Sequence, residues 1–130
     1  MTLLETLHKP RRLRRKPPRR DDTARICRLM EMAVAVSFAV PVDELRAPSR
    51  CRADVAFARQ TAMYLAHVAL GLSYSATAVL FHRDRTTVAH ACQLVEERRD
   101  DPAVDRVLHM LEGICCDLAR GLPTPPQVQP

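Results

Sequence analysis

Four consecutive polar residues in the second half of the chain carry side chains suited to reading DNA bases. Asp84, Arg85, Thr86 and Thr87 follow a short polar turn and open a predicted helix over about 85–99. A guanidinium matches the acceptors of guanine, a carboxylate accepts from the cytosine amino group, and threonine methyls meet thymine methyls. The other side of this helix is apolar, with Val88, Ala91, Cys92 and Val95 at helical spacing. The pattern predicts a helix-turn-helix that enters the major groove.

Each of these residues also has a purely structural interpretation. Asp84 stands where a helix N-cap is expected, and its carboxylate can accept from the free N–H groups of the first turn. Capping and base reading are compatible roles for one carboxylate. Arg85 can instead pair with a phosphate or a neighbouring acid, and Thr86 and Thr87 can be ordinary surface residues. The prediction of base reading therefore depends on all four residues occurring together at the start of one half-buried helix.

The chain offers little for catalysis, metal binding or membrane insertion. No Ser/His/Asp, Cys/His or paired-carboxylate arrangement is convincing, and the ATP-binding pattern GxxxxGK[ST] is absent. The most apolar segment, Met32–Val42, is too short to span a membrane. We therefore expect no enzyme activity, no cofactor and no metal. The cysteines have neither CxxC spacing nor a zinc pattern, and are predicted to be packing residues in a reducing cytosol: Cys27, Cys51, Cys92, Cys115 and Cys116.

Positive charge is concentrated at the N-terminus. Residues 9–20 (KPRRLRRKPPRR) hold eight basic residues, and Glu5 is the only acid before Asp21, so residues 1–20 carry +7. The net charge of the chain is +5, which leaves −2 for residues 21–130. The segment has too little apolar surface to order itself. It predicts a flexible basic arm that strengthens binding to DNA phosphates, with a solubilising tail as the alternative.

The elements that position these residues are predicted to be helical. Aromatic residues and glycines are scarce, whereas Ala, Val, Leu and Arg are common, which favours short packed helices over a sheet. Apolar spacing and cap residues predict an all-α bundle of five or six helices, over about 23–39, 42–46, 53–70, 73–81, 85–99 and 102–120. The helix-turn-helix covers about 73–99. We expect a disordered basic arm over 1–20, a helical domain over 21–120 and a disordered tail over 121–130.

Residues 27–112 resemble the fourth, C-terminal domain of the bacterial replication initiator DnaA. The family's signature, roughly Gly-Gly-Arg-Asp-His-Thr-Thr-Val-x-His-Ala, is similar to the stretch from His82 to Ala91 here. The resemblance implies a DNA-binding helix-turn-helix with Asp84, Arg85 and Thr86 at the base-reading positions. It further implies contacts to the DNA backbone from Arg59, Gln60, His67, Tyr74, Ser75, Thr87 and His90, and a minor-groove contact from Arg50 or Arg52.

Two departures from the family signature matter for specificity. Arg85 replaces the family's base-reading histidine, and the Gly-Gly pair is reduced to His82. Imidazole and guanidinium present different donors, and a shorter turn changes the tilt of the helix. We therefore expect a recognition site that differs from the initiator's own. Without the initiator's ATPase module, this chain is not expected to melt an origin by the initiator's mechanism.

The sequence favours a cytoplasmic, nucleoid-associated protein whose partner is double-stranded DNA. Sequence-specific transcriptional regulation is the main hypothesis, and competition for initiator sites at an origin is the alternative within DNA biology. From a different class, the domain could have lost DNA reading and act as a protein-interaction module. The last predicted helix has a long apolar stripe, which predicts either core packing or, through Ile114–Leu118, a contact to a second copy or another protein.

Overall fold

The structure, a computed structural model, describes residues 20–47 and 52–121. Within these ranges the chain is all-α, as the sequence predicted, and contains no strand. The elements are α2 (Arg20–Phe38), the short 3-10 helix η1 (Val42–Leu45), α3 (Ala53–Val68), α4 (Tyr74–Phe81), α5 (Arg85–Arg98) and α6 (Pro102–Ala119). The basic arm predicted over 1–20 and the tail predicted over 121–130 lie outside the described residues, except for Arg20, which begins α2, and Gly121, which follows α6.

The helix boundaries follow from local chemistry. The Ser73 hydroxyl accepts a hydrogen bond from the Ala76 N–H at 3.0 Å, which caps the start of α4. Asp101 does the same for α6 by accepting from the Ala103 N–H at 2.9 Å, with Pro102 in the first turn. Gly71 follows α3 with a φ of 75°, a left-handed conformation that costs glycine little. The sequence predicted each of these helix ends.

α3 lies at the centre of the bundle and contacts α2, α4, α5, α6 and η1. Val55, Ala58, Ala62 and Leu65 recur at helical spacing and form a buried stripe, but burial extends to residues on the other faces of the helix: Arg59, Thr61, Met63, Tyr64 and Ala66. Helical spacing of apolar residues indicates only the stripe. The additional burial arises because neighbours pack on several sides of α3 at once.

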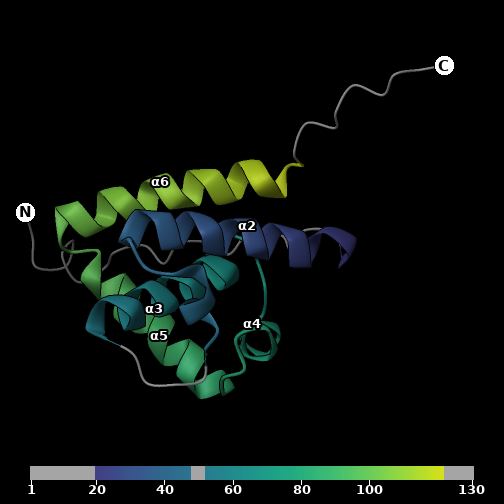
Figure 1. Cartoon of the computed structure of the whole chain (residues 1–130), viewed down its shortest axis with the longest axis horizontal. Helices are drawn as coiled ribbons and strands as arrows, with labels where there is room; N and C mark the ends of the chain where they lie inside the picture. Colours follow the sequence, from purple (N-terminus) through teal and green to yellow (C-terminus); the bar gives the residue numbers. More distant parts are fainter. Residues whose placement is uncertain (1–19, 48–51, 122–130) are drawn as a thin grey trace, which may run out of the picture.

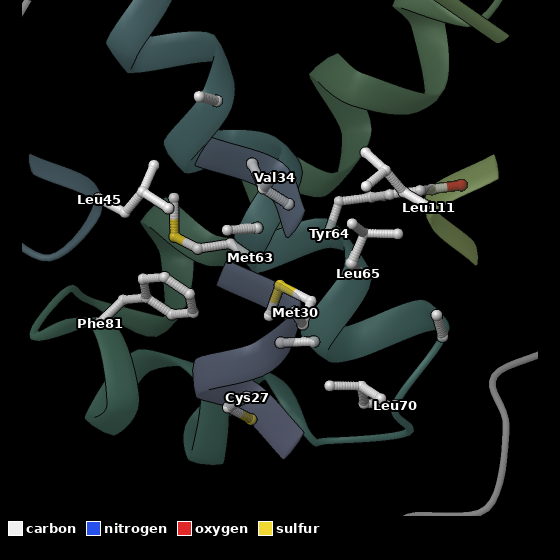
Figure 2. Packing of buried hydrophobic residues seen from close by; sticks show 14 of the residues in the cluster. Cys27, Met30, Val34, Leu45, Met63, Tyr64, Leu65, Leu70, Phe81 and Leu111 are labelled. Carbon is white, nitrogen blue, oxygen red and sulfur yellow. The ribbon is translucent and has the colours of Figure 1, made fainter. Parts of the chain in front are cut away.

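A single apolar core surrounds α3. Figure 2 shows part of it, and the labelled residues include Met30 of α2, Leu45 of η1, Leu65 of α3, Phe81 of α4 and Leu111 of α6. Each fully buried side chain of this size stabilises the fold by roughly 1.5–3 kcal/mol relative to an exposed one. No helix within the described ranges is long and apolar enough to cross a lipid bilayer.

α2 and α6 lie side by side and run in opposite directions on one side of the molecule, with α4 and α5 on the other (Figure 1). The apolar stripe of α6 packs inward, since Leu108, Leu111, Cys115 and Leu118 are buried within the chain. Cys115 and Leu118 are therefore used for intramolecular packing. Of the two predicted roles for this stripe, the structure supports core packing.

A buried polar network joins α6 to the centre of the bundle. The Tyr64 hydroxyl donates to Glu96 Oε2 at 2.6 Å, and Arg99 Nη1 donates to the Tyr64 oxygen at 3.2 Å. Arg99 Nε donates to Asp105 Oδ1 at 2.6 Å, and Arg99 Nη1 also donates to Glu112. Tyr64 belongs to α3, Glu96 to α5, and the last two carboxylates to α6. One guanidinium thus connects three parts of the fold.

Arg99 carries its charge in the interior because its partners outweigh the cost of burial. Only 3% of the residue is exposed. Burial lowers the pKa of the guanidinium, but the hydrogen bonds that it donates to Glu112, Asp105 and Tyr64 raise the pKa by more, so the group stays charged at all relevant pH values. Burial, followed by the hydrogen bond to Glu96, raises the pKa of Tyr64, which therefore remains a neutral donor.

The cysteines within the described ranges serve mainly as packing residues. Cys27, Cys92 and Cys115 are buried free thiols and Cys116 is half-buried, whereas Cys51 lies outside the described residues. Burial raises the pKa of Cys27 to about 11 and those of Cys92 and Cys115 to about 12. Since the thiolate is the reactive form, these three thiols are unreactive at neutral pH.

We expect Arg99→Ala to destabilise the protein by about 3–5 kcal/mol, because it removes the buried guanidinium that pairs with the half-buried carboxylate of Glu112. Urea unfolding followed by circular dichroism measures this change. Arg106→Ala removes an exposed arginine of α6 instead; it is the control and should change the free energy of unfolding by less than about 0.5 kcal/mol. Equal effects of the two substitutions would contradict a stabilising role for the network.

Candidate nucleic-acid interface

α4 and α5 form the helix-turn-helix, and His82 makes the turn between them. His82 follows α4 with a φ of 53° and a ψ of 48°, the left-handed conformation, and its N–H bonds to carbonyls of Ala78 and Val79. The Arg83 N–H donates to the Ala78 carbonyl at 2.9 Å and completes the turn. A residue with a side chain pays a conformational cost here that glycine avoids. His82 thus adopts a conformation typical of glycine, and it makes the turn alone where the family has two glycines.

The start of α5 presents to solvent the residues predicted to read bases, together with two residues predicted to contact the DNA backbone, Thr87 and His90. Asp84, Arg85, Thr86 and Thr87 are all exposed, and His90 is exposed one turn later. The opposite face is buried through the predicted set of Val88, Ala91, Cys92 and Val95. The free N–H groups at a helix N-terminus also favour anions such as phosphate. The first turn of α5 can therefore enter a groove while its inner face holds it to the bundle.

The structure separates the two interpretations of Asp84. Asp84 occupies the N-cap position of α5 with extended backbone, a φ of −70° and a ψ of 150°. Its side chain makes no capping hydrogen bond. The sequence correctly placed the residue at the helix start, but the predicted capping role is wrong. The exposed carboxylate remains available for another donor.

Arg59, for which the family resemblance implies a contact with the DNA backbone, is buried in the structure. Only 8% of the residue is exposed. Its Nε donates to the Leu45 carbonyl at 3.0 Å and its Nη2 to the Glu44 carbonyl at 2.6 Å. The guanidinium therefore holds η1 against α3. Its predicted contact with DNA phosphate stays a prediction, and the geometry gives the residue a structural role first.

Two other residues predicted near the DNA backbone lie against each other. The rings of His67 and Tyr74 stack with centroids 4.0 Å apart and an interplanar angle of 20°. His67 Nδ1 lies 2.7 Å from the Leu72 carbonyl oxygen, and because a carbonyl only accepts, Nδ1 is the donor. Both residues are half-buried, as is Gln60, whereas Ser75 is exposed on α4. The stacked pair fixes the end of α3 relative to the start of α4.

Of the two arginines that were candidates for the minor groove, the structure describes only Arg52. Arg50 lies outside the described residues. Arg52 precedes α3, and 73% of its side chain is exposed; its Nε lies 3.6 Å from Asp54 Oδ1, which is itself 55% exposed. A pair as open as this contributes little to stability and is easily exchanged for another anion.

Two arginines near the turn, Arg83 and Arg46, had no role predicted from the sequence. Arg83 Nη2 donates to the Ala47 carbonyl at 2.8 Å, and its Nη1 to the His82 carbonyl at 3.1 Å. Arg46 makes a two-bond ion pair with Glu31 of α2, at 2.6 and 2.7 Å. The position of Arg83 directly before Asp84 was the available signal, but sequence spacing does not reveal that its side chain points toward η1.

α5 is half-buried, exposes polar residues in its first turn, and follows a short helix and a tight turn. This arrangement defines a helix-turn-helix module of the kind that binds DNA. A family model described as the helix-turn-helix of bacterial DnaA protein matches residues 28–95. The chain belongs to this family. The match extends from α2 into α5 and ends before α6, which begins at Pro102.

Individual relatives are replication initiators much longer than this chain. It is 35% identical over 72 residues to chromosomal replication initiator protein DnaA 2 of Chlamydia trachomatis serovar D, covering 55% of this chain and 16% of the relative. It is 36% identical over 66 residues to DnaA 1 of Protochlamydia amoebophila, covering 51% and 14% respectively. DnaA 2 of Chlamydia pneumoniae is 33% identical over 82 residues, covering 62% and 18%. The chain thus spans less than a fifth of these relatives.

We expect Arg59→Lys to destabilise the protein by about 1–3 kcal/mol even without DNA, because one ammonium cannot reproduce the fork that serves the carbonyls of Glu44 and Leu45. Urea unfolding measures the change, with Arg52→Lys as the exposed control. If Arg59→Lys leaves stability unchanged but weakens binding to DNA, Arg59 acts on phosphate and not on η1.

Proposed function

We propose that this protein binds double-stranded DNA at specific sequences and acts as a transcriptional regulator. The observation that carries the proposal is the exposed group of Asp84, Arg85, Thr86 and Thr87 at the start of α5, whose opposite face is buried. In helix-turn-helix proteins the N-terminal residues of the second helix contact base edges. Asp84 accepts from a cytosine amino group, Arg85 contacts a guanine, and Thr86 meets a thymine methyl.

Other residues supply affinity without sequence information. Thr87 and His90 on α5 and Ser75 on α4 are exposed and hold the DNA backbone beside the groove. Gln60, His67 and Tyr74 line the adjoining end of α3 and the start of α4. Arg50 or Arg52 enters the neighbouring minor groove, and the basic residues of 9–20 neutralise further phosphates. The protein therefore acts at the nucleoid in the cytoplasm.

A second candidate function is control of replication by competition for initiator sites. It is favoured by the names of the relatives, which are chromosomal replication initiators. Arg85 argues for a different site, because the family has histidine there. Selection of bound sequences from a random duplex pool distinguishes the candidates: an enriched motif unlike the initiator's site supports a separate regulator. Enrichment of the initiator's site supports competition, and no enrichment overturns both.

We expect Arg85→Ala to relax the preference at one base pair and to leave affinity for random duplex largely intact. A bidentate arginine–guanine pair contributes roughly 1–3 kcal/mol of discrimination against the wrong base. Binding to a panel of single-base operator variants measures the effect, and Arg85→His should shift the preference toward the initiator's site. Uniformly weaker binding across the panel, with every base preference retained, would mean that Arg85 contacts phosphate instead.

We expect Arg50→Ala and Arg52→Ala to differ in their dependence on flanking sequence. One should weaken binding mainly to sites with A·T-rich flanks, where a narrow minor groove attracts an inserted guanidinium. The other should behave as a backbone contact, with similar losses for both kinds of flank. Titrations against probes with A·T or G·C flanks compare them. A flank preference that survives both substitutions would exclude this loop from the minor groove.

A further inference from the structure

We propose that Arg83 is a positioning residue, which sets the base preference of Asp84 and Arg85 by tying the turn before α5 to Ala47 without itself contacting DNA. This inference rests on the proposed function. Its basis is one guanidinium with three backbone acceptors: Nη2 donates to the Ala47 carbonyl at 2.8 Å, and Nη1 donates to the carbonyls of His82 at 3.1 Å and Phe81 at 3.3 Å. The donors of a planar guanidinium point in fixed directions, so these bonds orient the turn.

The anchor of this connection is itself held in place. Ala47 follows η1, and its N–H donates to the Glu44 carbonyl at 3.3 Å. Arg59 of α3 donates to the carbonyls of Glu44 and Leu45, the latter buried in the core. Arg46 pairs with Glu31 of α2 through two bonds of 2.6 and 2.7 Å. Ala47 is therefore fixed to both α2 and α3, and Arg83 transmits that position to the turn.

The start of α5 depends on this connection because it lacks the side-chain hydrogen bond that usually caps a helix N-terminus. Asp84 stands at the N-cap position but makes no side-chain cap bond. His82 is in the left-handed conformation, which a non-glycine residue adopts only when its surroundings enforce it. Base-reading groups must be held within about 0.5 Å of their productive positions. Arg83 supplies this constraint one and two residues before Asp84 and Arg85.

The alternative is that Arg83 contacts a phosphate directly, since its side chain is only half-buried. Salt dependence separates the two roles. Each phosphate contact contributes about 0.9 to the slope of log affinity against log salt concentration. A positioning residue leaves that slope unchanged and alters base preference, whereas a phosphate contact does the opposite.

The experiment compares Arg83→Ala and Arg83→Lys in the full chain, with Arg106→Ala as a control that removes one exposed positive charge from α6. Binding is measured to the selected operator, its single-base variants and random duplex over a range of salt. We expect both Arg83 variants to lose most of the preference at the base pairs read by Asp84 and Arg85, with unchanged slope and unchanged affinity for random duplex. Arg106→Ala should retain every preference.

A double variant separates positioning from general weakening. If Arg83 acts through Arg85, then Arg83→Ala combined with Arg85→Ala should discriminate at that base pair no less than Arg85→Ala alone. Arg83→Lys keeps the test valid if the alanine variant unfolds. A slope reduced by about 0.9, or preferences retained in both Arg83 variants, overturns the inference alone. A wild-type protein with no base preference overturns the proposed function and the inference together.

Discussion

The burial of α3 on nearly all sides is the constraint on which the rest of the structure depends. Because α3 contacts α2, α4, α5, α6 and η1, each of these described elements is placed by its packing against one common helix. α5 is held through its inner face, which leaves its first turn exposed, and α4 follows from the end of α3 through the stacked pair of His67 and Tyr74. A change in the packing of α3 would therefore move both halves of the helix-turn-helix.

Arginines are used in two different ways in this protein. Arg59 and Arg99 are buried and donate to carbonyls or carboxylates inside the fold, where their hydrogen bonds offset the cost of removing charge from water. Arg52 and Arg85 are exposed and free of such packing. The division matters for function, because a basic residue near a DNA-binding helix does not by itself indicate a DNA contact. Its burial and its acceptors decide which role it has.

α6 extends the fold beyond the part of the chain that matches the DnaA family. Its apolar stripe covers α2 and α3, and the network around Arg99 fixes it to Tyr64 and Glu96. Apolar burial supplies most of the attraction, whereas the network specifies one orientation for the helix. The result is a bundle in which α5 and the covering helix α6 lie on different sides of α3.

The sequence by itself determined the all-α class, the order of the helices, the caps at Ser73 and Asp101, and the buried face of α5, because periodicity and capping are local properties of the chain. It also determined that Asp84 to Thr87 would open a half-buried helix. Only the tertiary structure decided that Arg59 and Arg83 turn toward η1 and that Asp84 leaves the cap bond unmade. A long side chain has many carbonyls within reach, and which one it meets depends on packing between segments far apart in sequence, which no local pattern records.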